Sequence, residues 1–169
     1  MKQKRLYIIS GPSGSGKSSW VQKRIAEFGG NWISRDLIRF SLVDEGEDYF
    51  SKEKEVLKEF YNSINTYLGH DIYHKDIYVD ATHLTPRARK ELFRNINYGQ
   101  AAEIIGVSFE IPVDVALQRN SGRIGRSHVP DTVIKRMCNQ FIPPKFEEGY
   151  TSIIHINELG EERVENLNG

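Results

Sequence analysis

The 169-residue chain contains one cysteine, Cys138, which excludes an intramolecular disulfide or a multi-cysteine metal site and suggests a packing residue in a helix. Its apolar runs are far shorter than the roughly 20 residues that a membrane-spanning helix needs. The 23 basic and 23 acidic residues cancel, which disfavours a tight, general nucleic-acid binder because such proteins are usually basic. Together with 38% hydrophobic residues, these absences predict one globular, cytoplasmic domain over residues 1–169.

The chain does contain a complete phosphate-binding P-loop, G-x-x-x-x-G-K-[ST], over residues 11–18. An apolar run before it predicts a buried strand, and a helical pattern follows it. In this context Lys17 would reach the β- and γ-phosphates of a nucleoside triphosphate, and the Ser18 hydroxyl would ligate Mg²⁺. We therefore expect ATP or another NTP, with Mg²⁺, to bind at Gly11, Ser13, Gly14, Ser15, Gly16, Lys17, Ser18 and Ser19.

Apolar runs typical of strands alternate with helical segments, which predicts an α/β fold with a parallel sheet and helices on both faces. The strands are expected near 5–10, 31–34, 76–80, 103–109 and 152–156. The helices are expected near 19–27, 48–69, 86–97, 113–120 and 131–141. The core should extend over about 5–156, and the polar tail 157–169 is expected to fray or to form one weak helix.

A second motif, SRDLIR over residues 34–39, follows the second predicted strand and should start a helix. Asp36 and Arg39 are three residues apart and therefore share a helix face. In a phosphotransferase, Asp36 would orient an acceptor hydroxyl, and Arg39 would hold an anionic group of the acceptor. An aspartate that complements the helix dipole, with an incidental ion pair to Arg39, explains the same residues equally well.

A third motif, VDATHL over residues 79–84, stands at the end of a predicted strand, where α/β sheets form their ligand crevice. Asp80 would touch Mg²⁺ through water or bond to Ser18, and Thr82 would donate to a phosphate. His83 is a substrate-contact candidate, although a single histidine at a strand end is more often a local hydrogen-bonding group. His70 and His74 are assigned to surface or packing roles.

The segment 119–130 contains three arginines, Arg119, Arg123 and Arg126, together with two glycines, and lies between two predicted helices. A flexible, cationic connection of this kind would close over a triphosphate and place positive charge on the transferring phosphoryl group. The alternative is a solvated basic loop. Beside a P-loop, the lid is the better interpretation.

The order of these four motifs resembles that of the 5′-polynucleotide kinase family over about residues 5–156. The resemblance implies a P-loop kinase fold with a five-stranded parallel sheet ordered 2-3-1-4-5, and transfer of the γ-phosphate of ATP to the 5′-hydroxyl end of RNA or DNA. It implies that Asp36 is the general base and that Arg39 grips the phosphate next to the acceptor hydroxyl. It also implies an acceptor-phosphate contact for Thr82, and an essential lid arginine, Arg123, supported by Arg119.

Some features depart from that family. His83 stands where relatives often have asparagine, and the lid is one residue longer than in some relatives, so Arg126 could share or replace the role of Arg123. A phosphatase or ligase partner would be a separate protein, because the chain has no room for either domain. Two alternatives stay open: a P-loop kinase of a nucleoside, sugar, antibiotic or nucleotide-sugar, which the neutral net charge favours, and an ATP-dependent switch that changes a partner's shape.

Overall fold

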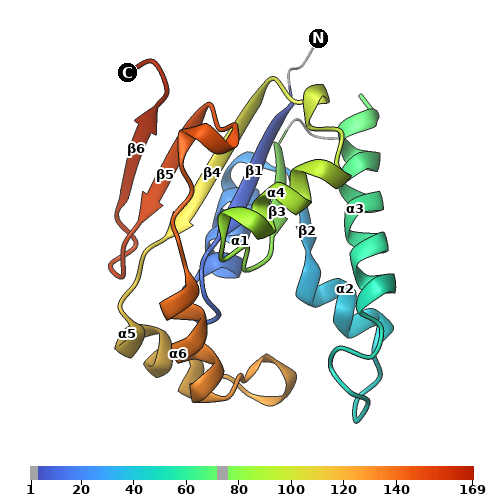
Figure 1. Cartoon of the computed structure of the whole chain (residues 1–169), viewed down its shortest axis with the longest axis vertical. Coiled ribbons are helices and arrows are strands. Elements are labelled where there is room, and N and C mark those ends of the chain that lie inside the picture. Colours follow the sequence, from blue (N-terminus) through green and yellow to red (C-terminus); the bar gives the residue numbers. More distant parts are fainter. Residues whose placement is uncertain (1–3, 72–75) are drawn as a thin grey trace.

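The computed structural model describes residues 4–71 and 76–169. Its strands are β1 (Arg5–Ser10), β2 (Asn31–Ser34), β3 (Asp76–Asp80), β4 (Glu103–Phe109), β5 (Ser152–Ile156) and β6 (Glu162–Asn166). They form one sheet in the order β2-β3-β1-β4-β5-β6, which Figure 1 shows obliquely. The first five strands of the chain pair in parallel, and β6 pairs antiparallel with β5.

Six α-helices and three short 3₁₀ turns connect these strands in the described part of the chain. They are α1 (Lys17–Phe28), α2 (Arg35–Leu42), α3 (Glu53–Gly69), α4 (Pro86–Asn95), η1 (Tyr98–Gln100), α5 (Val113–Ser121), η2 (Gly125–Ser127), α6 (Asp131–Gln140) and η3 (Phe146–Glu148). Side chains fix two of the helix starts: the Ser34 hydroxyl accepts from the Leu37 N–H, and the Thr85 hydroxyl accepts from the Ala88 N–H.

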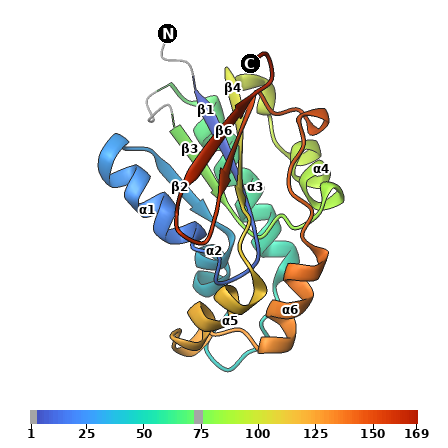
Figure 2. The ribbon, with the colours of Figure 1, turned by 90° about the vertical axis from the view of Figure 1, so that its left-hand side faces the viewer.

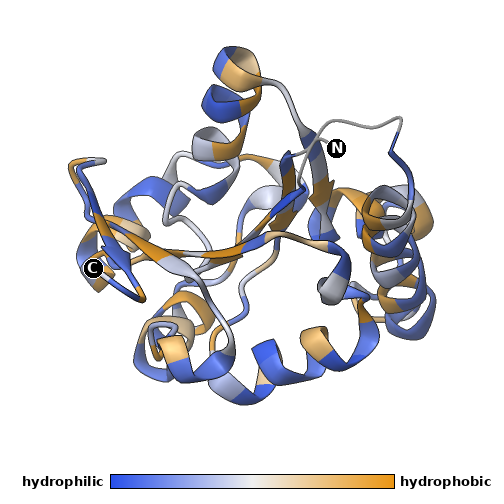
Figure 3. Ribbon diagram, turned by 90° about the horizontal axis from the view of Figure 1, so that it is seen from above, coloured by the Kyte–Doolittle hydropathy of each residue, from blue (hydrophilic) through white to orange (hydrophobic). Residues whose placement is uncertain are grey.

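The alternation of side chains along β1 builds a separate core on each face of the sheet. Leu6 and Ile8 pack with residues of α3 and α4 on one face, whereas Tyr7 and Ile9 pack with residues of α1 on the other. Figure 2 shows α1 and α4 on opposite sides of the sheet. In Figure 3 the apolar colour follows the central strands. The helices α2, α5 and α6 instead lie near the carboxyl ends of the parallel strands, where the candidate site forms (Figure 1).

The predicted α/β fold and the predicted order of the five parallel strands are confirmed. The prediction for the tail was wrong, because residues 162–166 form β6 rather than a helix or a frayed end. A tight turn starts this strand: the Asn157 side-chain oxygen accepts from the Leu159 and Glu161 N–H groups, and Gly160 has a φ of +78°. The predicted 48–69 helix begins only at Glu53, because residues 48–52 form turns.

The structure also gives the positions of the cysteine and of one of the two histidines that were assigned to packing or surface roles. Cys138 lies half-buried on α6, and His70 is exposed just after α3. His74 lies outside the described residues. None of the helices in the described ranges is long and apolar enough to cross a bilayer.

Candidate functional site

The P-loop joins the carboxyl end of β1 to the first turn of α1, as the strand–loop–helix pattern predicted. Its backbone is closely packed at Gly14, which has a φ of +82° and lies so near α5 that a Cβ atom there would be 2.7 Å from the Ala116 carbonyl oxygen. Only glycine fits both constraints without strain. The free N–H groups of the first turn of α1 then face the loop and favour an anion.

Lys17 connects the motifs electrostatically. Its ammonium group donates a 2.8 Å hydrogen bond to the Pro12 carbonyl oxygen and so crosses the loop. Burial lowers the pKa of Lys17, whereas the carboxylates of Asp80 and Asp36 raise it and the charge of Arg123 lowers it further. Charged residues from the three other sequence motifs therefore lie within electrostatic range of the P-loop ammonium group.

Asp80, at the end of β3, accepts two hydrogen bonds on its Oδ2 atom, 3.1 Å from Ser18 Oγ and 3.0 Å from Trp32 Nε1. Burial raises the pKa of Asp80, although the ammonium of Lys17 opposes the shift. A serine hydroxyl and a carboxylate are oxygen donors of the kind that Mg²⁺ prefers, usually together with water and substrate phosphates. The pair Ser18–Asp80 therefore fits the metal that the motif implies.

Asp36 and Arg39 lie on the first turns of α2 and form an ion pair, with 3.2 Å between Arg39 NH1 and Asp36 Oδ1. The two side chains differ sharply in exposure: that of Asp36 is 63% exposed and that of Arg39 only 5%. Arg39 NH2 also lies 2.6 Å from Glu53 Oε2, at the start of α3. Burial alone would raise the pKa of Glu53, but its bonds to Arg39 and Arg35 lower it. A grip of Arg39 on an acceptor phosphate, as expected from the sequence, would require some of these contacts to rearrange.

The segment between α2 and α3 adds two aromatic residues that the sequence analysis did not select. The Tyr49 hydroxyl donates to Asp36 Oδ1 at 2.8 Å and accepts from Arg39 NH1 at 3.1 Å. The Tyr49 ring also lies against the Arg39 guanidinium, 4.5 Å from its centroid, and Phe50 packs edge-on against Tyr49. Residues 49 and 50 had been predicted only as part of the 48–69 helix, and neither was assigned a functional role.

Thr82 and His83 lie beside the P-loop but have different surroundings. The Thr82 carbonyl accepts from the Gly11 N–H at 2.9 Å, and the residue is partly exposed. His83 is buried, with its Nδ1 atom 2.7 Å from the Ile9 carbonyl oxygen and a φ of +40°. Its side chain is therefore held inside the fold by a local hydrogen bond, and it does not present the acceptor contact that the sequence suggested.

Burial makes His83 a source of acid sensitivity, because it lowers the pKa of this imidazole from 6.5 to about 4. Between these pH values the unfolded chain binds a proton that the folded chain does not. The contribution of neutral His83 to the free energy of unfolding is therefore fully present above pH 6.5, and it is lost as the pH falls from 6.5 toward 4. We expect His83→Asn, whose side chain tolerates a positive φ, to remove about 3 kcal/mol of this loss. Urea unfolding at several pH values measures it, with the exposed His128→Asn as control; equal slopes in both variants would contradict the assignment.

The three arginines of the predicted lid do not converge on one point. Arg119 NH1 donates to the Ser15 carbonyl of the P-loop at 3.0 Å, and Arg123 NH1 lies 3.3 Å from the Ser127 carbonyl. Arg126 instead points to the end of α2, where it donates to the Phe40 carbonyl at 3.3 Å and to the Val43 carbonyl. The role of Arg126 as a phosphate ligand is thus not supported by its contacts, because helix-end carbonyls already occupy its guanidinium.

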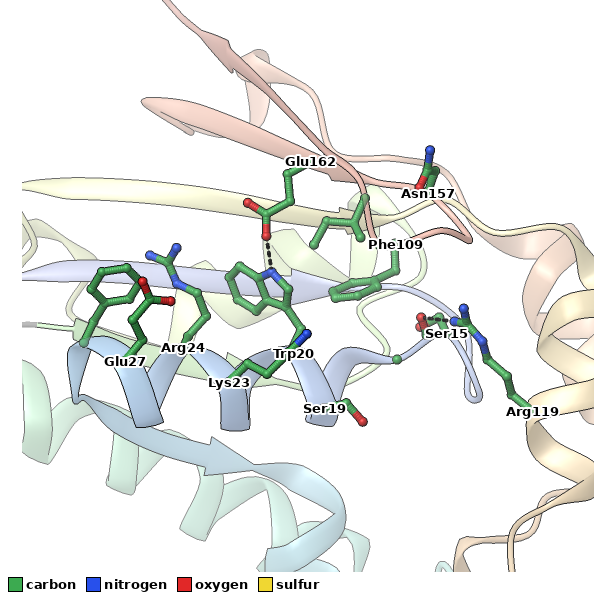
Figure 4. A pocket seen from close by; sticks show the side chains of 14 residues that line it. Ser15, Ser19, Trp20, Lys23, Arg24, Glu27, Phe109, Arg119, Asn157 and Glu162 are labelled. Atoms are coloured by element: carbon green, nitrogen blue, oxygen red, sulfur yellow. Dashed lines mark hydrogen bonds between the residues drawn. The ribbon is translucent and has the colours of Figure 1, made fainter.

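A cavity of about 550 Å³ opens beside the P-loop, between α1 and the β5–β6 edge of the sheet. Figure 4 shows Ser15 and Arg119 at one end, Lys23 and Glu27 farther along α1, and Glu162 of β6 opposite. A 2.7 Å hydrogen bond from Trp20 Nε1 to Glu162 Oε1 joins the two walls. Asp36 is not among the residues that line this cavity.

The sequence matches the model of one protein family, AAA_33, described as an AAA domain, over residues 6–144. The match includes the P-loop, both carboxylates and all three lid arginines. The chain belongs to the AAA_33 family. This membership supports nucleotide binding at the P-loop, and the sheet order is that of a P-loop kinase. No curated protein matches the sequence.

Solved structures with the same fold as this AAA_33 domain include kinases of different acceptors. A chain from a Pnkp1/Rnl/Hen1 RNA repair complex has 22% identity and a TM-score of 0.69, over 82% of this chain and 44% of that one. A fungal RNA kinase has 15% identity and a TM-score of 0.63, over 92% and 78%. A sugar kinase from a Janibacter species has 14% identity and a TM-score of 0.65, over 94% and 87%.

Identities this low show a shared fold and leave the acceptor open. This chain spans less than half the length of the chain from the RNA repair complex. Within the AAA_33 domain, the P-loop, Asp36 and Asp80 are recognisable from local sequence. Sequence reasoning missed Trp32, Tyr49 and Glu53, which contact the two carboxylates or Arg39 from other elements. Only the folded chain brings these residues together.

Proposed function

We propose that this protein transfers the γ-phosphate of ATP to the 5′-hydroxyl end of an RNA or DNA strand. The observation that carries this proposal is the exposed Asp36 carboxylate, whose charge acts on the P-loop ammonium of Lys17. A hydroxyl that donated to Asp36 would lie within electrostatic range of the ammonium that the P-loop motif assigns to the β- and γ-phosphates. Catalysis of phosphoryl transfer consists mainly of such positioning, together with stabilisation of the developing charge.

In the proposed reaction the acceptor oxygen forms a bond to the γ-phosphorus, the bond to the β–γ bridging oxygen breaks, and ADP leaves. Asp36 orients the hydroxyl and accepts its proton. Lys17 and Arg123 stabilise negative charge on the phosphoryl oxygens. Ser18 and Asp80 would hold Mg²⁺, which neutralises charge on the β- and γ-phosphates when it is bound. The cavity beside Ser15 and Arg119 offers room for the nucleoside part of ATP.

The choice of a polynucleotide acceptor rests on the order of the Asp36–Arg39 motif, the VDATHL motif and the arginine segment along the chain. The likeness in fold to a chain of an RNA repair complex and to a fungal RNA kinase agrees with it. A phosphatase or ligase that acts on the same ends would be a partner of this enzyme.

A kinase of a small-molecule hydroxyl is the second candidate, and two observations favour it. Arg39 is buried in an ion pair with Glu53, so its guanidinium is already compensated. Moreover, the exposed segment after α2 contains four acidic residues, Asp44, Glu45, Glu47 and Asp48. These charges would repel the phosphates of a long strand that passed over this segment.

The deciding experiment offers one protein several acceptors. Labelled γ-phosphate of ATP, with Mg²⁺, is followed onto 5′-hydroxyl RNA, 5′-hydroxyl DNA, nucleosides and sugars. Label on an oligonucleotide and not on the free nucleoside would support the polynucleotide kinase. Label on a small molecule alone would move the assignment to the second candidate, and ATP hydrolysis that needs no acceptor would indicate a nucleotide-dependent switch.

A further inference from the structure

Tyr49 is the residue that contacts both members of the Asp36–Arg39 pair. Its hydroxyl lies 2.8 Å from Asp36 Oδ1 and 3.1 Å from Arg39 NH1. Its ring covers the Arg39 guanidinium at 4.5 Å. Tyr49 comes from the turn segment before α3, so the chain places a hydroxyl from a separate element on the carboxylate that the proposed chemistry needs.

The two oxygens of Asp36 have different surroundings. Oδ1 accepts from both Tyr49 and Arg39. Within residues 4–71 and 76–169, no protein group donates a hydrogen bond to Oδ2 of Asp36. The Asp36 side chain is 63% exposed. Because two donors hold Oδ1, Oδ2 is the oxygen of this exposed carboxylate that is left for a ligand or solvent.

We propose that Tyr49 is a positioning residue, which holds Asp36 by Oδ1 so that Oδ2 accepts the hydrogen bond of the acceptor hydroxyl. This inference rests on the proposed function, since it concerns the same carboxylate. It adds a residue outside the SRDLIR motif to the acceptor site. Tyr49 touches neither the phosphate nor the acceptor in this role, and acts through Asp36.

The surroundings of Tyr49 suit a permanent donor. Burial raises the pKa of its phenol, and the Asp36 carboxylate raises it further, although Arg39 acts in the opposite direction. The phenol therefore keeps its proton at neutral pH and can donate to Asp36. Arg39 NH2 also donates a hydrogen bond to Glu53, and this bond keeps the Arg39 guanidinium in place against the Tyr49 ring.

Tyr49→Phe tests the role because it removes the hydroxyl and keeps the ring on Arg39. We expect kcat for phosphoryl transfer to fall about tenfold, since a hydrogen bond to a charged group is lost, with the KM for ATP and for the acceptor unchanged. Tyr98→Phe is the matched control: this exposed tyrosine precedes β4, at the opposite ends of the strands from Asp36. Tyr98→Phe should keep the wild-type melting temperature, and Tyr49→Phe, which loses both hydrogen bonds of its hydroxyl, should remain folded at the assay temperature.

A double-mutant cycle separates action through Asp36 from a general effect. In the Asp36→Asn protein, Tyr49→Phe should cause no further loss of kcat if Tyr49 acts only through that carboxylate. An additional tenfold loss would overturn the proposal. A rise in kcat/KM for the acceptor in Tyr49→Phe would also overturn it, because the phenol would then be competing with the acceptor hydroxyl for Asp36.

A measurement without acceptor keeps this inference distinct from the proposed function. In protein labelled at the tyrosine ring carbon that bears oxygen, the Tyr49 resonance is assigned by its absence in Tyr49→Phe and titrated with pH. Asp36→Asn should lower the pKa of Tyr49, because it removes the neighbouring negative charge. An unchanged pKa would show that the two groups do not touch and would overturn the inference. If no acceptor were phosphorylated although this titration showed the contact, the proposed kinase activity would be wrong, and the contact between Tyr49 and Asp36 would still stand.

Discussion

Asp36→Asn is expected to lower the rate of phosphoryl transfer about a thousandfold, the usual scale for loss of a general base. Asparagine has nearly the same shape, and its carbonyl oxygen can still accept from Arg39 and Tyr49, so the local fold is kept. The variant loses the charge that orients the acceptor hydroxyl and takes up its proton. ATP affinity should stay within a few-fold of wild type, because Asp36 lies outside the P-loop. Single-turnover transfer of labelled phosphate and equilibrium binding of ATP measure the two effects.

Asp44→Asn is the matched control for this substitution. Asp44 is an exposed carboxylate just after α2, and its loss changes the net charge by the same amount. It should leave the transfer rate within about twofold, since an exposed charge outside the site is strongly screened. If Asp36→Asn kept more than a tenth of the wild-type rate, the carboxylate would not be the proton acceptor, and the mechanism proposed here would be wrong.

Arg89→Met is expected to destabilise the fold by about 3–5 kcal/mol, the range found when one partner of a buried ion pair is removed. The Arg89 side chain is fully buried on α4. Its Nε and NH2 atoms donate to the two oxygens of Glu148 at 2.6 and 3.1 Å, and NH1 donates to the His83 carbonyl at 2.7 Å. Methionine would fill much of the volume and leave both acceptors without these donors. Urea unfolding followed by circular dichroism at pH 7 gives the difference.

Two further variants define the cause of that loss. Arg87→Met removes an exposed arginine from the same helix and should change stability by less than about 0.5 kcal/mol. Glu148→Gln added to Arg89→Met should restore part of the lost stability, because the unpaired charge disappears while the bond from the Lys145 N–H is kept. A loss below about 1 kcal/mol in Arg89→Met would mean that water or another donor replaces the guanidinium.

The parallel part of the fold could be predicted from sequence, because each buried strand is a short apolar run bounded by turn residues. The strand β6 could not, since Glu162, Arg163 and Glu165 give it a polar composition. Its stability comes from pairing with β5, from Val164 opposite Ile154, and from the bond between Glu162 and Trp20 of α1. These contacts are tertiary, and no local propensity reports them.

The candidate site also contains parts that local sequence predicts and parts that it does not. The P-loop is recognisable because all of its groups lie within eight consecutive residues, 11–18. The direction of a side chain beside a motif is harder to predict: His83 turns inward to Ile9, and Arg126 turns to α2. Tyr49 was missed for the opposite reason, because it lies in an acidic segment with no motif of its own and reaches Asp36 across 13 positions of sequence.

The contacts of Arg126 hold segment 122–130 against the end of α2. The Phe40 and Val43 carbonyls at the end of α2 lack further helical donors, and Arg126 supplies them while its guanidinium stacks on the Phe40 ring at 4.6 Å. Any rearrangement that drew Arg126 toward a triphosphate would strip those carbonyls of their donor. Hydrogen bonds that involve a charged group are each worth about 1.5–3 kcal/mol. Segment 122–130 is therefore fastened to the end of α2, and a closure over the P-loop that moved Arg126 would first have to break these contacts.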